Sequence, residues 1–331
     1  MVGMLSCFYA SAGLTAETET AVTSVNVDDS QDKWFTYRYA DAQEASQLLL
    51  SNRDYYENLT QEDLNYRMQK KGATLEELEA FASSQTLDFT EGEKAAINAV
   101  MEEIHNICKE RGYVLPPVNG IVFAKSTNAD ECDAGGYTHG TQIYLSAEMM
   151  ESALRDDPMD KNGFRTTIAH ELFHCLTRNN PDFRSAMYQV LGFTVVEDDY
   201  IFPENIRNII ISNPDVEHHN SYATFKIDGK DIDCVTVFTV TKPFEKPGDN
   251  FFYRQQTGLI PIDDLSVMYK AEDASNFYDI FGYNTVYVID PEETLADNFS
   301  YTIIEGLDQE WYQTPEMIRA IDKLLIEHPY L

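Results

Sequence analysis

The sequence predicts an α+β fold, in which a small mixed sheet in the middle of the chain lies between helical segments. Helix-type spacing of apolar residues with helix caps fills residues 40–111, whereas β-branched and aromatic runs between glycine-containing turns follow from residue 118. Helical spacing returns after residue 290, so strands and helices are segregated along the chain, as in α+β proteins. The 331 residues, 43% of them hydrophobic, suffice for a sizeable core.

Residues 1–32 are expected to be an export leader followed by a linker. The stretch "MVGMLSCFYASAGLTAETE" passes from apolar through small to polar residues, the order of the later parts of an export signal, although it lacks a basic start. "MLSC" also resembles a bacterial lipoprotein box, which makes Cys7 a candidate lipid anchor. The alternative is a plain N-terminal tail. The protein is therefore expected to be secreted, periplasmic or tethered to the cell surface.

Residues 33–116 are expected to form an N-terminal helical region. Gly72 and Gly112 stand where helices would end. Three threonines each precede an acidic residue by two or three positions, as helix N-caps do: Thr60, Thr74 and Thr90.

Strand signals begin in the second region, residues 117–331. "VNGIVFAKST" and "TQIYLSAE" are expected to be strands on either side of a glycine-containing loop. "KIDGKDIDCVTVFTV" predicts a hairpin that turns at "DGK", and "NTVYVI" predicts another short strand. Three helices complete this region: Arg165 to Arg178, "DPEETLADNFSYTIIEGL" and "TPEMIRAIDKLLIEH".

Composition excludes some classes of protein. The chain has 24 Lys and Arg against 56 Asp and Glu, a net charge of −32, which disfavours binding to nucleic acids. No run approaches the ~20 apolar residues of a membrane-spanning helix. Beyond Cys7 there are four scattered cysteines without a CxxC pair, which argues against a cysteine-based zinc site. They are either one or two disulfides or buried thiols.

The stretch "HELFH" carries the chemistry. His170 and His174 are four residues apart, so on a helix both imidazoles project from one side and can reach one metal ion. Zinc suits imidazole ligands and lowers the pKa of its bound water toward ~7. Glu171 is placed to take a proton from that water. The alternative is that this motif occurs by chance. A zinc site would also need a third ligand elsewhere in the chain.

A third ligand is available in "DPEETLADNF". Glu293 and Asp297 are four residues apart and would face the same way on a helix. Glu293 could complete a His-His-Glu triad, with Asp297 accepting a hydrogen bond from a ligand histidine. Capping is the competing explanation, because Asp290, Pro291 and Glu293 also form a good helix start. Capping leaves Asp297 unexplained.

Together these motifs resemble the glutamate-zincin (gluzincin) clan of zinc metallopeptidases, in which ExxxD follows HExxH far downstream. More narrowly, "HELFHCLTRNNPDFRSAMYQVLGF" with "DPEETLADNF" resembles a group of uncharacterised bacterial zinc peptidases, roughly from Gly120 to the C-terminus. The resemblance implies that residues 117–331 form a zincin-like catalytic region, with a small mixed sheet, an active-site helix and a helical C-terminal subdomain. It also implies one Zn²⁺ ion and hydrolysis of peptide bonds.

The resemblance assigns roles to particular residues. His170, His174 and Glu293 would bind the zinc, Glu171 would be the general base, and Asp297 would support a ligand from the second shell. One position departs from the pattern. Several clan members carry Asn directly before the ligand glutamate, whereas this chain carries Glu292, which puts the support of the second histidine in doubt.

The oxyanion formed during peptide hydrolysis needs a hydrogen-bond donor, which in this clan is usually a His or Tyr from a later segment. "NPDVEHHNSYATF" supplies His218, His219 and Tyr222, of which we favour His219. The alternative is that these three are surface loop residues without a special role. The segment "GGYTHGTQIYLS" has the position of the edge strand along which zincins hold a substrate. Its His139 is expected to be exposed to solvent and not a ligand.

The expected function is zinc-dependent hydrolysis of extracellular peptides or proteins, by an endopeptidase, since the exopeptidase signature GxMxN is absent from the sequence. The alternatives are a zinc-containing cell-surface binding protein without turnover, and an acidic surface module with accidental histidines.

Overall fold

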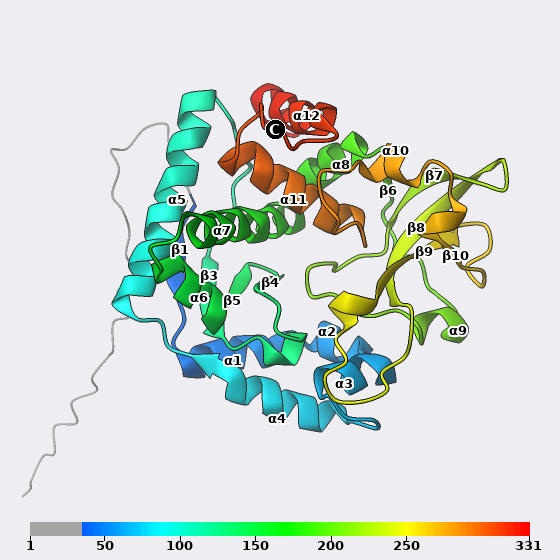
Figure 1. Cartoon of the computed structure of the whole chain (residues 1–331), viewed down its shortest axis with the longest axis horizontal. Coiled ribbons are helices and arrows are strands. Elements are labelled where there is room, and N and C mark those ends of the chain that lie inside the picture. The colour runs from blue at the N-terminus through cyan, green and yellow to red at the C-terminus, as the bar shows by residue number, and fades with distance from the viewer. Residues whose placement is uncertain (1–34) are drawn as a thin grey trace, which may run out of the picture.

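The computed structural model describes residues 35–331. The predicted leader, linker and lipid anchor at Cys7 lie outside the described residues. The described part of the chain is a mixed α+β structure with two five-stranded sheets, which confirms the predicted fold class (Figure 1). None of its helices combines the length and apolar character needed to cross a membrane.

Helices make up most of the regular structure. In chain order they are α1 (Ala42–Ser51), α2 (Arg53–Asn58), α3 (Gln61–Arg67), α4 (Leu75–Gln85), α5 (Glu91–Arg111), α6 (Ala147–Leu154), α7 (Pro158–Asn179), α8 (Pro181–Val190), α9 (Glu204–Arg207), α10 (Phe277–Phe281), α11 (Pro291–Ile304) and α12 (Pro315–Glu327).

The strands belong to two separate sheets. Those of the first sheet are β1 (Tyr37–Tyr39), β2 (Thr86–Leu87), β3 (Ile121–Ser126), β4 (Gly136–His139) and β5 (Gln142–Ser146). Those of the second sheet are β6 (Thr194–Val195), β7 (Ser221–Ile227), β8 (Lys230–Val240), β9 (Gln255–Pro261) and β10 (Tyr269–Lys270).

The first sheet is mixed and buried on both faces. Its order is β1-β3-β5-β4, with β2 also paired to β3, and β4 is an edge strand. Alternate residues of β3 and β5 point to opposite faces, as the period of a strand requires. One face packs into the core under α5 and α7 through Ile121, Phe123, Ile143 and Leu145. The other packs against α1 and α4 through Val122, Ala124 and Tyr144.

Helix α7 lies over the first sheet, and α11 lies along α7 on the side away from that sheet (Figure 1). Apolar side chains on both helices hold them together. Phe173 and Phe299 pack with ring centroids 5.3 Å apart, and Ala296 is fully buried where the helices approach each other. This packing positions the residues of "HELFH" against those of "DPEETLADNF".

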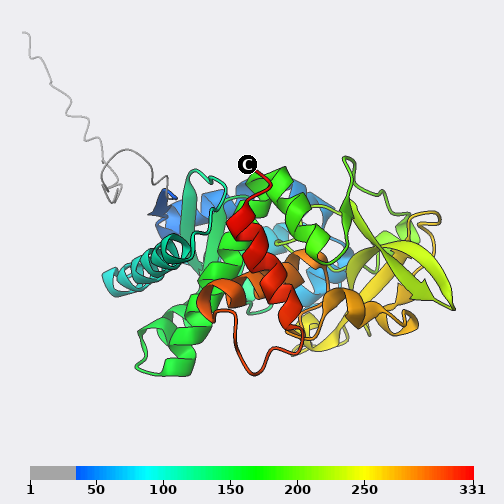
Figure 2. The ribbon, with the colours of Figure 1, turned by 90° about the horizontal axis from the view of Figure 1, so that it is seen from above.

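The second sheet lies to one side of the helices, with the order β10-β9-β8-β7-β6 (Figure 2). The predicted hairpin at its centre is confirmed, because β7 and β8 pair around Asp228 and Gly229. Both turn residues have positive φ angles, 50° and 74°, which suit an Asp-Gly turn. The sequence predicts this hairpin but not the sheet built around it.

Most predicted helices are confirmed, including their starts at Thr60, Thr74 and Thr90, each with a capping box. The helix predicted from Arg165 begins earlier, at Pro158, because Asp157 caps it. The four cysteines in the described part of the chain are buried thiols: Cys108, Cys132, Cys175 and Cys234.

Two local predictions are wrong. "NTVYVI" is not a strand, and it lies against α11, where the side chains of Asn284 and Thr285 donate to Asn298 and Asp297. The N-terminal region is also not purely helical, because β1 and β2 both pair with β3.

A buried arginine connects the N-terminal helices to a loop that matters for the site. Arg67 of α3 is 1% exposed and forms ion pairs with Asp63 at 2.9 Å and Glu131 at 2.7 Å. Its guanidinium also donates to the carbonyl oxygen of Ser212 at 2.7 Å, and Asp63 accepts from the backbone N–H of Ser212 at 2.8 Å. Helix α3 therefore holds the start of the loop at residues 212–217.

We predict that Arg67→Met destabilises the fold by about 3–5 kcal/mol, because it leaves two buried carboxylates without their cation. Chemical denaturation measures the effect. Arg53→Met is the control, since its ion pairs with Glu57 and Glu79 lie at the surface and its loss should leave the midpoint unchanged. Equal midpoints for both variants would contradict the role assigned to Arg67.

Candidate metal centre

The predicted ligands come from α7 and α11. His170, His174 and Glu293 each offer one ligand atom, and these three atoms lie within 4.8 Å of one another. The two histidines share a face of α7 because they are one turn apart, and their ring centroids are 4.8 Å apart. Residues separated by more than a hundred positions in sequence are thus brought to one point.

One oxygen of Glu293 faces both imidazoles. Its Oε2 lies 3.1 Å from His170 Nε2 and 3.7 Å from His174 Nε2. Ligands at 2.0–2.1 Å from a tetrahedral zinc ion are separated by about 3.4 Å. The spacing of these atoms therefore matches part of a zinc coordination shell.

The outer nitrogen of each histidine meets a carboxylate. His170 Nδ1 lies 2.9 Å from Asp297 Oδ1, and His174 Nδ1 lies 3.0 Å from Glu292 Oε1. A proton on each Nδ1 leaves each Nε2 lone pair free to bind a metal, the usual arrangement around a ligand histidine. Asp297 occupies the place that the sequence predicts for it.

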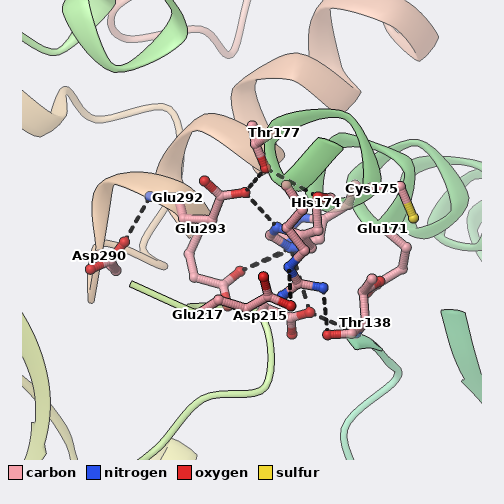
Figure 3. A network of polar contacts seen from close by, with 12 residues as sticks. Thr138, Glu171, His174, Cys175, Thr177, Asp215, Glu217, Asp290, Glu292 and Glu293 are labelled. Carbon is pink, nitrogen blue, oxygen red and sulfur yellow. Dashed lines mark hydrogen bonds and ion pairs between the residues drawn. The ribbon is translucent and has the colours of Figure 1, made fainter. Parts of the chain in front are cut away.

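Glu292, which in the sequence is only a departure from the family pattern, contacts a predicted ligand histidine. Its carboxylate accepts a hydrogen bond from Thr177 at 2.5 Å, beside His174 (Figure 3). It accepts another from Tyr188 at 2.8 Å, and the two bonds fix it against His174. A carboxylate here supports the second histidine at least as well as an amide, because it can only accept a hydrogen bond. The doubt about His174 is thereby removed on physical grounds.

The unpaired atom in this cluster is the one that a metal would bind. His174 is fully buried, and its Nε2 has no hydrogen-bond partner among the described residues. A buried polar atom without a partner is costly unless something fills its place. Although burial lowers the pKa of His170, the carboxylates of Asp297 and Glu293 raise it well above its usual value. This environment stabilises positive charge, and the residues present fit a zinc ion.

Glu171 is buried beside the presumed ligands and points toward β4. Its Oε2 accepts a hydrogen bond from the Thr138 hydroxyl at 2.8 Å (Figure 3). A Cβ atom at Gly136 would lie 2.7 Å from Glu171 Oε1, so this glycine leaves room for the carboxylate. Burial raises the pKa of Glu171, while His170 and His174 lower it. A raised pKa suits a carboxylate that must accept a proton near neutral pH.

Two further residues orient Glu293. Its Oε1 accepts a hydrogen bond from the Asn213 amide and another from the Tyr287 hydroxyl at 3.4 Å, which leaves Oε2 for the metal position. Neither residue is predicted from the sequence. Asn213 lies in a loop without periodicity, and Tyr287 lies in the segment wrongly predicted to be a strand, so neither carries a local signal.

The predicted oxyanion donors lie away from these contacts. His219 is half-buried and packs against Phe202, and burial lowers its pKa to about 4. His218 is exposed and pairs with Asp199 at 2.9 Å, while Tyr222 is half-buried on β7. His218 and His219 line a cleft of about 710 Å³ that also includes Asn213, so they border the site without entering it.

The prediction that His139 is exposed is wrong. The residue is 4% exposed, and its ring packs against the aromatic rings of Tyr55, Tyr137 and Tyr144. Burial lowers its pKa to about 3. His139 is buried because it is the last residue of β4 and its ring faces these tyrosines, whereas the sequence predicts a loop residue exposed to solvent.

Comparison with protein families, with curated proteins and with solved structures finds no match to this chain.

We predict that Glu292→Ala weakens zinc binding by about 10–100-fold, the usual cost of losing the partner of a ligand histidine. Competition with a chromophoric chelator measures the affinity. Glu292→Gln keeps an oxygen that can accept from His174 Nδ1 and should lose less. Unchanged affinity in the alanine variant would show that Glu292 does not support a ligand.

Proposed function

We propose that the protein is a zinc-dependent peptidase with a zincin-like catalytic core, in which His170, His174 and Glu293 hold one Zn²⁺ ion. The observation that carries this proposal is the position of Glu293 Oε2, which lies within 3.7 Å of both imidazole Nε2 atoms. A capping role for Glu293 does not require that convergence, because Asp290 alone caps α11 by accepting from the N–H of Glu292.

Zinc held by these residues would polarise the carbonyl group of the substrate and lower the pKa of an attacking water molecule toward ~7. Glu171 accepts the proton of that water and passes it to the leaving amine. The Thr138 hydroxyl holds the Glu171 carboxylate in place, and Asp297 and Glu292 keep both imidazoles in the binding tautomer.

Tyr287 is the oxyanion donor that the geometry favours over His219. Its hydroxyl lies 3.4 Å from Glu293 Oε1, at the edge of the ligand set, and its side chain is partly accessible. Burial raises the pKa of Tyr287 well above its usual value, so the hydroxyl keeps its proton at neutral pH and can donate it. His219 remains the second candidate, from the wall of the adjoining cleft.

The substrates we propose are extracellular peptides or proteins that bind in an extended conformation, cut internally. The edge strand β4 lies beside the general base, because Thr138 of β4 contacts Glu171. An extended chain can add to such an edge through backbone hydrogen bonds. The cleft of about 710 Å³ beside β4 offers room for side chains.

One observation favours a second candidate, a zinc-containing surface protein without turnover. Asp215 is 7% exposed, and its Oδ1 lies 3.9 Å from His174 Nε2. Zinc sites closed by four protein ligands are usually structural, whereas catalytic sites keep one position open. A permanently bound Asp215 would make this centre structural.

We predict that Glu171→Gln lowers the hydrolysis rate of susceptible peptides by about 10²–10⁴-fold, the usual contribution of a general base, without loss of zinc. Cleavage of a mixed peptide library, with and without a zinc chelator, is read by mass spectrometry, and zinc content by elemental analysis. Glu316→Gln is the matched control, because this glutamate is exposed on α12.

Three outcomes separate the candidates. Chelator-sensitive cleavage that is lost in Glu171→Gln and kept in Glu316→Gln supports the peptidase. Stoichiometric zinc without cleavage by any variant supports the binding protein. Purified protein without zinc, which also fails to take it up, would exclude both.

A further inference from the structure

The segment Asn213–Glu217 lies against the metal centre and contributes a carboxylate to it. One ligand atom each from Glu171, His174 and Asp215 lie within 4.8 Å of one another, and His174 is shared with the ligand triad. In Figure 3, Asp215 lies beside His174 and Glu293, on the side where Glu171 and Thr138 lie.

Asp215 is a buried carboxylate beside the proposed ligands. Glu171 and Glu293 repel its charge, while His174 and Arg178 attract it. Its Oδ1 is 3.9 Å from His174 Nε2, beyond hydrogen-bond distance but close to the separation of two ligands on one zinc ion, about 3.4 Å. A dication between these atoms would relieve the repulsion.

The same segment occupies the edge of β4, where a peptide substrate would bind. Asp215 Oδ1 accepts the backbone N–H of Thr138 at 2.7 Å, and Glu217 accepts that of Gly140 at 3.2 Å. Arg178 donates to the Thr138 carbonyl oxygen at 2.7 Å. The outward-facing backbone groups that would receive an added strand are therefore taken by side chains of this protein.

Several contacts hold the segment in this position. Arg178 of α7 donates to the carbonyl oxygen of Pro214 at 2.6 Å and forms an ion pair with Glu217 at 3.1 Å. Asn213 bonds to the ligand Glu293, and α3 holds Ser212 through Asp63. The segment is thus attached on both sides of Asp215, which keeps the carboxylate at the metal position.

We propose that Asp215 is a fourth protein ligand of the metal, and that segment 213–217 closes the centre until a peptide displaces it from the edge of β4. This inference rests on the proposed zinc site. A purely structural zinc site does not need a general base such as Glu171, and a permanently open site does not need a further carboxylate such as Asp215. A centre that opens only for substrate accounts for both. The resting protein is then a closed, slowly active form.

Metal binding tests the proposal directly. The full chain is loaded with Co²⁺ in place of Zn²⁺, and its visible absorption spectrum is recorded for the natural protein, Asp215→Asn and Glu316→Gln. Zinc affinity of each is measured by chelator competition. Asp215→Asn keeps an oxygen for the Thr138 N–H but removes a strong ligand, and Glu316→Gln removes the same charge from an exposed position on α12.

We expect Asp215→Asn to weaken zinc binding at least about tenfold and to lower the intensity of the Co²⁺ bands, because water replaces a protein ligand and coordination expands. Glu316→Gln should keep the spectrum and the affinity. An unchanged spectrum and affinity in Asp215→Asn would overturn the proposal. Failure of the natural protein to bind either metal would instead overturn the proposed zinc site on which it rests.

Hydrolysis gives a second readout. If the segment closes the centre at rest, Asp215→Asn should raise kcat/KM for an extended peptide about fivefold or more, because less of the protein is in the closed state. The double variant Asp215→Asn with Glu171→Gln should be inactive. Unchanged or lower kcat/KM in the single variant would overturn closure by this segment.

Discussion

The packing of α11 against α7 is the constraint on which the candidate metal centre depends. The histidines on α7 and Glu293 on α11 can share one metal ion only because apolar contacts, such as that between Phe173 and Phe299, hold the two helices together. Ala296 of α11 is fully buried in the same core. The position of the carboxylate is thus a consequence of core packing, and the polar site is built on an apolar scaffold.

Charge balance is the second organising feature of the centre. Five carboxylates surround the two imidazoles, and most of them are buried: Glu171, Asp215, Glu292, Glu293 and Asp297. Taken out of water, so many carboxylates would oppose folding unless cations or hydrogen bonds compensate them. Hydrogen-bond donors such as Thr177 and Tyr188 satisfy Glu292, and the proposed dication would compensate the carboxylates at the centre.

The N-terminal helices take part in the site although they contribute no ligand. Arg67 and Asp63 of α3 hold Ser212, and the next residue, Asn213, bonds to Glu293. The centre is therefore assembled from three parts: α7, α11 and a loop anchored on α3. The segment beside the proposed metal position, residues 213–217, is therefore attached to α3, a helix far from the two motifs in the sequence.

By itself, the sequence determined the local structure and the candidate ligands. Capping boxes, helical spacing and the Asp-Gly turn are local signals, and the i, i+4 spacing of His170 and His174 defines one face of a helix wherever that helix lies. Only the tertiary structure decided which residues Glu292, Asn213, Tyr287 and Asp215 contact, and that His139 is buried. Those contacts join segments far apart in the chain, and no local pattern encodes which loop a packed core will bring beside the two histidines.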